Sequence, residues 1–386
     1  MIWQALAITG GWVPLSIAAG QSVALRSDEL GAPTAIYSLM VAGGWAVSMV
    51  SLPVMGGVAD RAVRRGLDRR LLIIVGAIGM LACFGLLGIA GSLPLFALVW
   101  LLAQIPTSLI VTSASSRLAN EAPASLRGWA STAAGLAPVV AITIGAITTL
   151  ALSAVPSALF FAPAVVGTVL LIPSLILTPL PTPTPTDEGV AIGSARRFFP
   201  WTLLIAIALA FSGLAVGRIY LVPLIESVST GSSDERITAL ASTTLLVATL
   251  GAVIGTVVSG RLLRSGRRSL STFGWFSLAS AVPLIALSLA ASVSQVIAIG
   301  AVFGFVIGAI NASAYGIFLH RYSHRQDTAR ILGLIVGAET VPYVIVPLAA
   351  AVSQASADAA LIPLLFAIGA ALAMAASVLT FARLKR

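Results

Sequence analysis

Long apolar runs separated by short polar connections occupy almost the whole chain. A helix needs about 20 apolar residues to cross the roughly 30 Å hydrocarbon core of a bilayer. Because the runs are continuous rather than alternating, they predict membrane-spanning helices and exclude a closed β-barrel. Twelve runs are long enough, and they predict an all-α membrane protein with spans at 3–25, 34–57, 71–91, 94–115, 129–151, 156–177, 201–223, 237–259, 272–290, 294–317, 331–352 and 360–381.

The first run, 3–25, has an alternative interpretation as a secretory signal. Such a signal has a basic segment before its apolar core, and the core is shorter than a membrane span. No basic residue precedes this run, and the run is longer than a signal core. We therefore expect a transmembrane span here.

The composition excludes the soluble protein classes. Charged residues make up 9% of the 386 residues and hydrophobic residues 58%, with a mean hydropathy of +1.04. A soluble domain carries about 25% charged residues, so a soluble enzyme or a nucleic-acid-binding domain is excluded despite the net charge of +9. The single cysteine excludes an internal disulfide, and together with two histidines it gives no metal-ligand spacing. We expect neither a metal nor a cofactor.

Arginine placement predicts the orientation in the membrane. Most of the 22 lysines and arginines fall in connections on one side, at 58–70, 117–127, 196–197, 261–268, 321–330 and 383–386. The side rich in Lys and Arg is cytoplasmic in multi-span proteins. Both termini are then cytoplasmic, which an even number of spans also requires. We expect a multi-pass protein of the bacterial plasma (inner) membrane.

A proline-rich segment divides the chain into two halves. Residues 178–200 contain PLPTPTPTDEG, and alternating Pro and Thr favour an extended, semi-rigid spacer. The segment predicts a cytoplasmic linker between a six-helix bundle at 1–177 and another at 201–386.

The two halves repeat short motifs in corresponding loops. Gly56 to Arg65 reads GGVADRAVRR, and a weaker copy runs from Gly255 to Arg268, which places the two glycines 199 residues apart. Arg127-Gly128 before the fifth span has a counterpart in Arg330 before the eleventh, at an offset of 203. Matching offsets indicate a duplicated six-helix unit.

At these residues the chain resembles the major facilitator superfamily. That family has a G-x-x-x-D-R-x-x-R-R-like motif between spans two and three, a weaker copy between spans eight and nine, and a pattern similar to Pro123–Gly128 before span five. The resemblance implies two pseudo-symmetric bundles that rock about a midplane site. It also implies a cytoplasmic gate built from Gly56, Asp60, Arg61, Arg65, Arg127 and Gly128.

The gate has a physical rationale at Asp60. An acid at a helix end can pair with loop arginines, or face the N-terminus of a neighbouring helix, in only one of two states. The alternative for the arginines of this loop, including Arg64 and Arg65, is that they only set topology.

The subfamily stays open between drug-exporter-like and sugar-efflux-like. Many proton-coupled exporters of the superfamily have an arginine in span four, whereas Trp100–Ser108 has no charge. Gly135-Leu-Ala-Pro138 resembles part of the glycine- and proline-rich stretch of exporters, without its double glycine.

Two charged residues lie at membrane depth, where a charge costs about 2.5–3.5 kcal/mol to insert. Glu339, in the middle of span eleven, is predicted to bind the coupling proton, because an acid in an apolar site tends to stay protonated. The alternative is a neutral acid bonded to a neighbouring helix.

Arg218, in span seven, is predicted to meet a substrate carboxylate, phosphate or polar oxygen, or to pair with Glu226 or Glu339. The alternative for Arg218 is snorkelling to the interface.

Uncharged polar and aromatic residues complete the predicted substrate site. By resemblance, spans one, four, seven and ten line the central cavity. The remaining candidates are Gln104, Asn311, Tyr315, Trp12, Trp100 and, more weakly, Gln21. The alternatives are hydrogen bonds between helices for the amides and interfacial packing for the tryptophans.

We therefore predict a secondary active transporter that works by alternating access, as a monomer, with protons and a small organic molecule as partners. The favoured activity is proton-coupled efflux of a drug-like or sugar-like molecule, and the alternative is a proton-coupled uptake symporter or a facilitator. A non-transporting scaffold or sensor, a channel and a membrane enzyme are rivals. An enzyme needs catalytic groups that converge at membrane depth, and none accompany Glu339.

Overall fold

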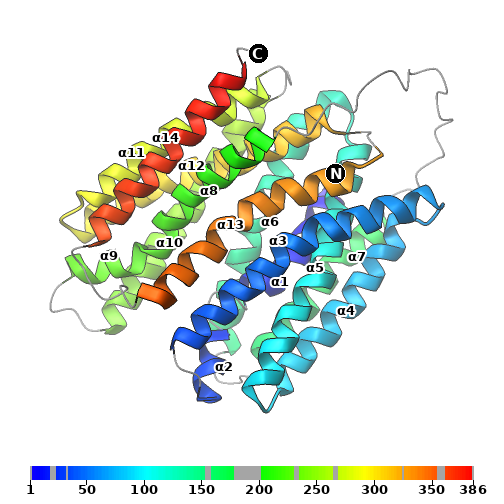
Figure 1. Ribbon diagram of the computed structural model, residues 1–386, viewed down its shortest axis with the longest axis horizontal. Coiled ribbons are helices and arrows are strands. Elements are labelled where there is room, and N and C mark those ends of the chain that lie inside the picture. Colours follow the sequence, from blue (N-terminus) through cyan, green and yellow to red (C-terminus); the bar gives the residue numbers. More distant parts are fainter. Residues whose placement is uncertain are drawn as a thin grey trace.

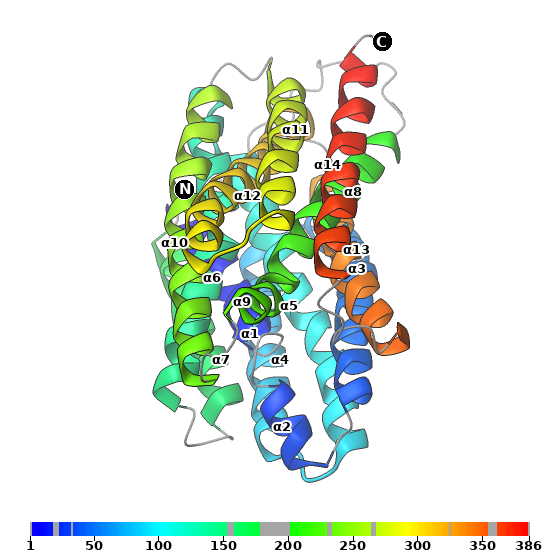
Figure 2. The same cartoon turned by 90° about the vertical axis from the view of Figure 1, so that its left-hand side faces the viewer.

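The computed structural model describes residues 2–17, 23–31, 34–152, 158–177, 201–229, 234–263, 268–323, 326–353 and 361–384. Every element within these ranges is a helix. Figure 1 shows long, roughly parallel helices, with α3 and α13 side by side along the middle of the molecule. The turned view in Figure 2 shows that most of the long helices share one direction, as expected for spans of a single bilayer.

The first half of the chain contributes eight described elements: α1 (Ile2–Ile17), α2 (Val23–Glu29), α3 (Thr34–Arg64), α4 (Arg69–Ile89), α5 (Leu93–Glu121), the 3-10 turn η2 (Ala124–Leu126), α6 (Arg127–Leu152) and α7 (Ala158–Ile176). The second half contributes seven: α8 (Trp201–Ile219), α9 (Leu221–Val228), α10 (Asp234–Leu262), α11 (Ser269–Ser288), α12 (Val293–Arg321), α13 (Thr328–Ser353) and α14 (Ile362–Leu384).

Ten of these helices are long and apolar enough to cross a membrane. They are α3, α4, α5, α7, α8 and α10 to α14, and each coincides with a predicted span. Helices α1 and α6 lie where the other two spans are predicted. The all-α membrane fold is therefore confirmed, while the count of twelve spans and the cytoplasmic position of both termini stay predictions.

The helices pack in two groups, one from each half of the chain. Helix α1 packs on α5, α6 and α7, and α14 packs on α8 and α11. Between the groups, α3 packs on α13, and α6 packs on both α10 and α12. The proline-rich linker lies outside the described residues, so the domain boundaries stay predictions.

Small residues allow the helices of the two groups to approach closely. A methyl group on Gly333 of α13 would overlap the backbone of Leu52 and Pro53 on α3. A methyl group on Gly56 of α3 would overlap the backbone of Ala329 on α13. Close backbone approach is a common way for membrane helices to associate, because lipid provides little hydrophobic drive between them.

Candidate functional site

A cavity of about 530 Å³ lies between the two groups of helices. The first half lines it from α1, α3 and α6, and the second half from α8, α12 and α13. The lining residues follow helical spacing: Tyr37, Val41 and Trp45 lie on one face of α3, and Phe211, Leu214 and Arg218 on one face of α8. The volume is within the range of about 300–1,000 Å³ that is usual for small-molecule sites.

Glu339 of α13 lines the inner part of the cavity, with only 8% of its surface exposed. The buried Tyr315 of α12 lies within electrostatic range of this carboxyl group and next to the side chain of Trp12 on α1. Among the described residues, Glu339 Oε1, the Tyr315 hydroxyl and Trp12 Nε1 have no hydrogen-bonding partner of good geometry. The Tyr315 hydroxyl and the Trp12 side chain are close enough to interact with each other. Because buried polar atoms in proteins are nearly always well paired, these three atoms indicate a site that a ligand or proton completes.

Arg218 and two aromatic rings form the outer part of the cavity. The Arg218 side chain is exposed, and its Nη1 lies 3.5 Å from the Tyr343 hydroxyl. Its guanidinium carbon lies 6.0 Å from the centre of the Tyr343 ring, at the edge of cation–π range. The centres of the Tyr343 and Trp45 rings are 5.1 Å apart, and this contact links the second half of the chain to the first. Among the described residues no ion pair joins Arg218 to Glu226 or Glu339.

Asp60, at the opposite end of α3 from Tyr37, joins the two groups of helices. Its carboxylate accepts hydrogen bonds from the backbone N–H groups of Ala329 at 3.1 Å and Arg330 at 2.9 Å. These groups lie in the first turn of α13, where backbone N–H groups have no partner within the helix and the helix dipole favours an anion. Arg69 lies 3.8 Å from the same carboxylate. We call Asp60 with the first turn of α13 the acid latch.

The other residues of the predicted gate have different surroundings. Arg61 Nε donates to Gly57 O of its own helix at 3.2 Å, and Arg65 is exposed. Arg64 Nη1 donates to Gln326 O at 3.1 Å, which adds a second contact between the groups.

The pseudo-symmetric position in the other half has a packed contact instead of an acid. Gly260 of α10 faces α6, where a methyl group would overlap Thr132 Oγ1 and approach Gly128 O. The Thr132 hydroxyl lies 3.5 Å from Thr256 O of α10. Gly128 is therefore part of this contact. We call it the glycine contact.

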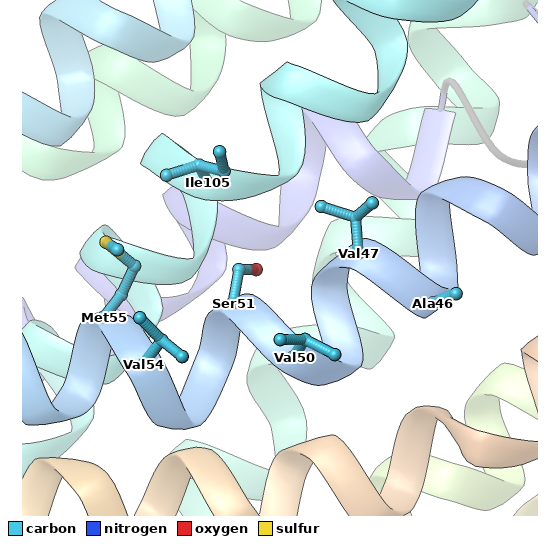
Figure 3. A pocket seen from close by; sticks show the side chains of 7 residues that line it. All are labelled: Ala46, Val47, Val50, Ser51, Val54, Met55 and Ile105. Atoms are coloured by element: carbon cyan, nitrogen blue, oxygen red, sulfur yellow. The ribbon is translucent and has the colours of Figure 1, made fainter.

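A second hollow, of about 480 Å³, lies between α3 and α5. Figure 3 shows that Ser51 is the one polar side chain among the seven residues drawn, which include Val50 and Val54. Its hydroxyl is 2.6 Å from that of Ser108, and Val50 is 58% exposed on the outside of the bundle. This hollow lacks charged and aromatic groups, so it is not the candidate site.

A sequence model of the family described as the Major Facilitator Superfamily matches residues 4–347. The chain belongs to the major facilitator superfamily. Among solved structures, 237 chains match, including the crystal structure of the human organic anion transporter MFSD10 (TETRAN). That structure is 13% identical, covers 98% of this chain and 96% of its own, and has a TM-score of 0.69. The likeness is one of fold. No curated protein matches the chain significantly.

Membership in this superfamily makes the chain a membrane transporter that binds a small molecule, rather than an enzyme. The cavity of this transporter contains four of the predicted site residues: Glu339, Arg218, Asn311 and Trp12. Tyr315 lies directly behind the lining, next to Trp12. Gln21 lies outside the described residues.

Gln104 and Trp100 do not line the cavity, although both were predicted to bind the substrate. Trp100 Nε1 donates to Met40 O at 3.0 Å, and Gln104 Nε2 donates to Trp100 O at 3.3 Å. The Trp100 side chain is therefore used where α5 packs on α3, and the Gln104 side chain bonds the backbone of its own helix α5.

Four aromatic lining residues were not predicted: Tyr37, Trp45, Phe211 and Tyr343. The available signal is their spacing, since Tyr37 and Trp45 are eight residues apart and Tyr343 is four residues from Glu339. Such spacing places them on one helix face but does not say whether that face meets lipid or a cavity.

Proposed function

We propose that this transporter is a proton-coupled secondary transporter that moves a small organic molecule through the cavity by alternating access. The observation that carries the proposal is the cavity itself. It is lined by both halves of the chain, and Glu339, a buried acid without a cationic partner among the described residues, lies at its inner end. Secondary transporters of duplicated architecture use such a site between their repeats.

The acid latch supports a role for Asp60 as a gate. It joins α3 to α13 at one end of the molecule, whereas the cavity lining on α3 runs from Tyr37 to Trp45 at the other end. Rocking of the two halves would separate Asp60 from the first turn of α13 and open the end that the arginine distribution predicts to be cytoplasmic. The described state then faces outward.

The cavity suits an amphipathic substrate with a ring or a broad apolar body. Aromatic residues line it from both halves, and Asn311, Ser38 and Thr340 add uncharged polar groups. A few polar groups in a mainly apolar wall fix orientation, while the apolar contacts supply most of the affinity.

Efflux in exchange for protons is the first candidate for direction. It rests on the exporter-like stretch Gly135–Pro138, where Pro138 lines the cavity and Gly135 packs on the backbone of Ala312.

Uptake with a proton is the second candidate, and Arg218 favours it. A cation in the cavity suits an acidic substrate, which binds better when Glu339 is neutral.

Proton flux in liposomes tests the proposal. Purified protein is reconstituted with a pH-sensitive dye inside, and sets of organic acids, amines and neutral aromatic compounds are added outside. We expect at least one set to move protons. Glu339→Gln is expected to abolish proton-driven transport while substrate exchange continues in part, because a neutral amide cannot carry a proton.

Glu226→Gln is the matched control, since Glu226 is an exposed acid in α9 outside the cavity lining. Full proton-driven transport by Glu339→Gln would remove Glu339 from the coupling role.

A further inference from the structure

Two charged groups of opposite sign line the cavity. Among the described lining residues, Arg218 has the only positive charge and Glu339 is the only acid. Arg218 lies in the last turn of α8, and Glu339 lies near the middle of α13. The substrate charge that the cavity favours therefore depends on which of these two groups is ionised and free to interact.

Arg218 is available for an anion. A guanidinium has five N–H donors, and the partner found among the described residues is the Tyr343 hydroxyl, at 3.5 Å. The side chain is exposed, and no described carboxylate forms an ion pair with it. A guanidinium binds carboxylates, sulfonates and phosphates through two parallel hydrogen bonds, which gives both affinity and orientation.

Among the described residues, Glu339 has no cationic partner. Helix α13 packs on α3, α5, α8 and α12. From these helices the titratable groups near the cavity are Tyr37 of α3, Arg218 of α8 and Tyr315 of α12, with Tyr343 on α13 itself and none from α5. A buried carboxyl group without a cationic partner favours its neutral form, so the cavity then has a net positive charge.

We infer that the substrate is a small organic anion whose acidic group binds Arg218 and whose apolar body lies along Trp45, Tyr37 and Phe211. The inference rests on the proposed transport through this cavity and adds the substrate class. The rings of the lining give flat contact area on either side of the cavity, and the guanidinium fixes the polar end.

The sign of the proton coupling follows from this substrate class. An ionised Glu339 repels an anion in the same cavity, so protonation of Glu339 favours anion binding. By reciprocity, the anion favours protonation to the same extent. Two like charges roughly 10 Å apart in a protein site change each other's affinity about tenfold. A proton and an anion that bind together move together, so this substrate class favours the second candidate for direction, uptake with a proton, over efflux by exchange.

Three probes of one shape and different charge test the inference. They are naphthalene sulfonate, naphthalene sulfonamide and naphthylmethyl ammonium, which are anionic, neutral and cationic. Their dissociation constants are measured on the full chain in nanodiscs of uncharged lipid, at mildly acidic and mildly alkaline pH. We expect the sulfonate to bind about tenfold more tightly than the other two, and more tightly at acidic pH.

Variants assign the effect to the two charges. Arg218→Gln is expected to remove the preference for the sulfonate, and Arg218→Lys to keep part of it. Glu339→Gln is expected to bind the sulfonate as tightly at alkaline pH as the unaltered protein does at acidic pH. Arg261→Gln is the matched control, because Arg261 is exposed at the far end of α10 and outside the cavity lining.

The outcomes separate this inference from the proposed function. Sulfonamide or ammonium binding at least as tight as that of the sulfonate, or sulfonate binding that strengthens at alkaline pH, overturns the anion class. If the probes bind in either of these ways and Trp45→Ala abolishes their binding, the cavity is still the binding site and the proposed function stands. Binding of all three probes that is unchanged in Trp45→Ala overturns both. The comparison of the three probes uses the unaltered chain, so its result does not depend on whether any variant folds.

Discussion

At the scale of single residues, the inner end of the cavity is unusual for its unpaired polar atoms. The Tyr315 hydroxyl has no good partner among the described residues, although the side chain is 2% exposed. A buried polar group without a partner costs about 1–3 kcal/mol of stability. Such a cost is expected where a site is complete only when it is occupied.

Two hydroxyl deletions test this interpretation. Tyr315→Phe is expected to leave the thermal stability unchanged or slightly higher, because it removes a hydroxyl group that makes no good hydrogen bond while the site is empty. Ser108→Ala removes a paired hydroxyl, 2.6 Å from that of Ser51, and is expected to cost about 0.6 kcal/mol.

Unfolding curves of the purified variants in detergent provide the comparison. Equal losses in both variants would show that the Tyr315 hydroxyl is paired, which contradicts an incomplete site.

Residues of this site differ in how far the sequence could reveal them. Glu339 was predictable, because an acid within an apolar run is costly and therefore informative. Tyr343 and Trp45 were not, because aromatic residues in a span face lipid or the interface as readily as a cavity. One argument selected both Gln104 and Asn311, and Asn311 lines the cavity while Gln104 does not, because a buried amide can bond a substrate or a helix backbone equally well.

At the scale of elements, two pairs of helices hold the halves together at one end. The acid latch joins α3 to α13 by hydrogen bonds to Asp60, and the glycine contact joins α6 to α10. The motif repeat predicted that these loops correspond, but it could not show that one contact is ionic and the other steric. Gly260 occupies the position where an acid was considered, so the sequence alone left its role open.

Asp60→Asn is expected to shift the resting state toward opening at the acid latch. An amide keeps one acceptor for the first turn of α13 but loses the charge that the helix terminus favours, worth about 0.3–1 kcal/mol. The readout is the alkylation rate of a cysteine placed at the buried Ser259, in a Cys83→Ser background. We expect the rate to rise several-fold.

Asp68→Asn is the control for this variant, because Asp68 caps α4 within its own half through Arg70 N–H. An alkylation rate that Asp60→Asn leaves unchanged would count against the latch.

Gly260→Ala tests the glycine contact in the same assay. The added methyl group overlaps Thr132 Oγ1 and approaches Gly128 O, so we expect faster alkylation at Ser259→Cys without any change of charge. Gly57→Ala is the matched control, because its methyl group would meet its nearest neighbours at 3.8 Å and 3.9 Å, which is ordinary contact. Slower or equal alkylation in Gly260→Ala would argue that the contact is not a gate.

At the scale of the whole molecule, the fold was largely predictable. Apolar runs of span length are a strong signal, because the bilayer tolerates few alternatives to a helix. The position of the helices relative to one another was not predictable from hydropathy, which is nearly uniform around these helices. The cavity and the closed end therefore required the three-dimensional arrangement.

Alternating access predicts that joining the halves at the closed end stops transport. Arg64 and Gln326 lie on opposite halves and are in contact. Cysteines at both positions, joined by a short bis-methanethiosulfonate linker in a Cys83→Ser background, are expected to abolish proton-coupled transport. Because this linker is attached through disulfides, reduction should restore transport. Cysteines at Ala62 and Leu67, which are in contact within the first half of the chain, are the control. Full transport by the joined protein would contradict rocking of the halves.

The unlike chemistry of the two closures gives the carrier two separate sensitivities. The carboxylate of Asp60 loses its charge when it binds a proton, so the α3–α13 side should loosen as the adjoining compartment becomes more acidic. The contact at Gly260 contains no formal charge, and its tightness depends on how firmly the surrounding lipid presses the helices together. Bilayer thickness and lateral pressure should therefore bias the same conformational equilibrium from the α6–α10 side, independently of proton concentration.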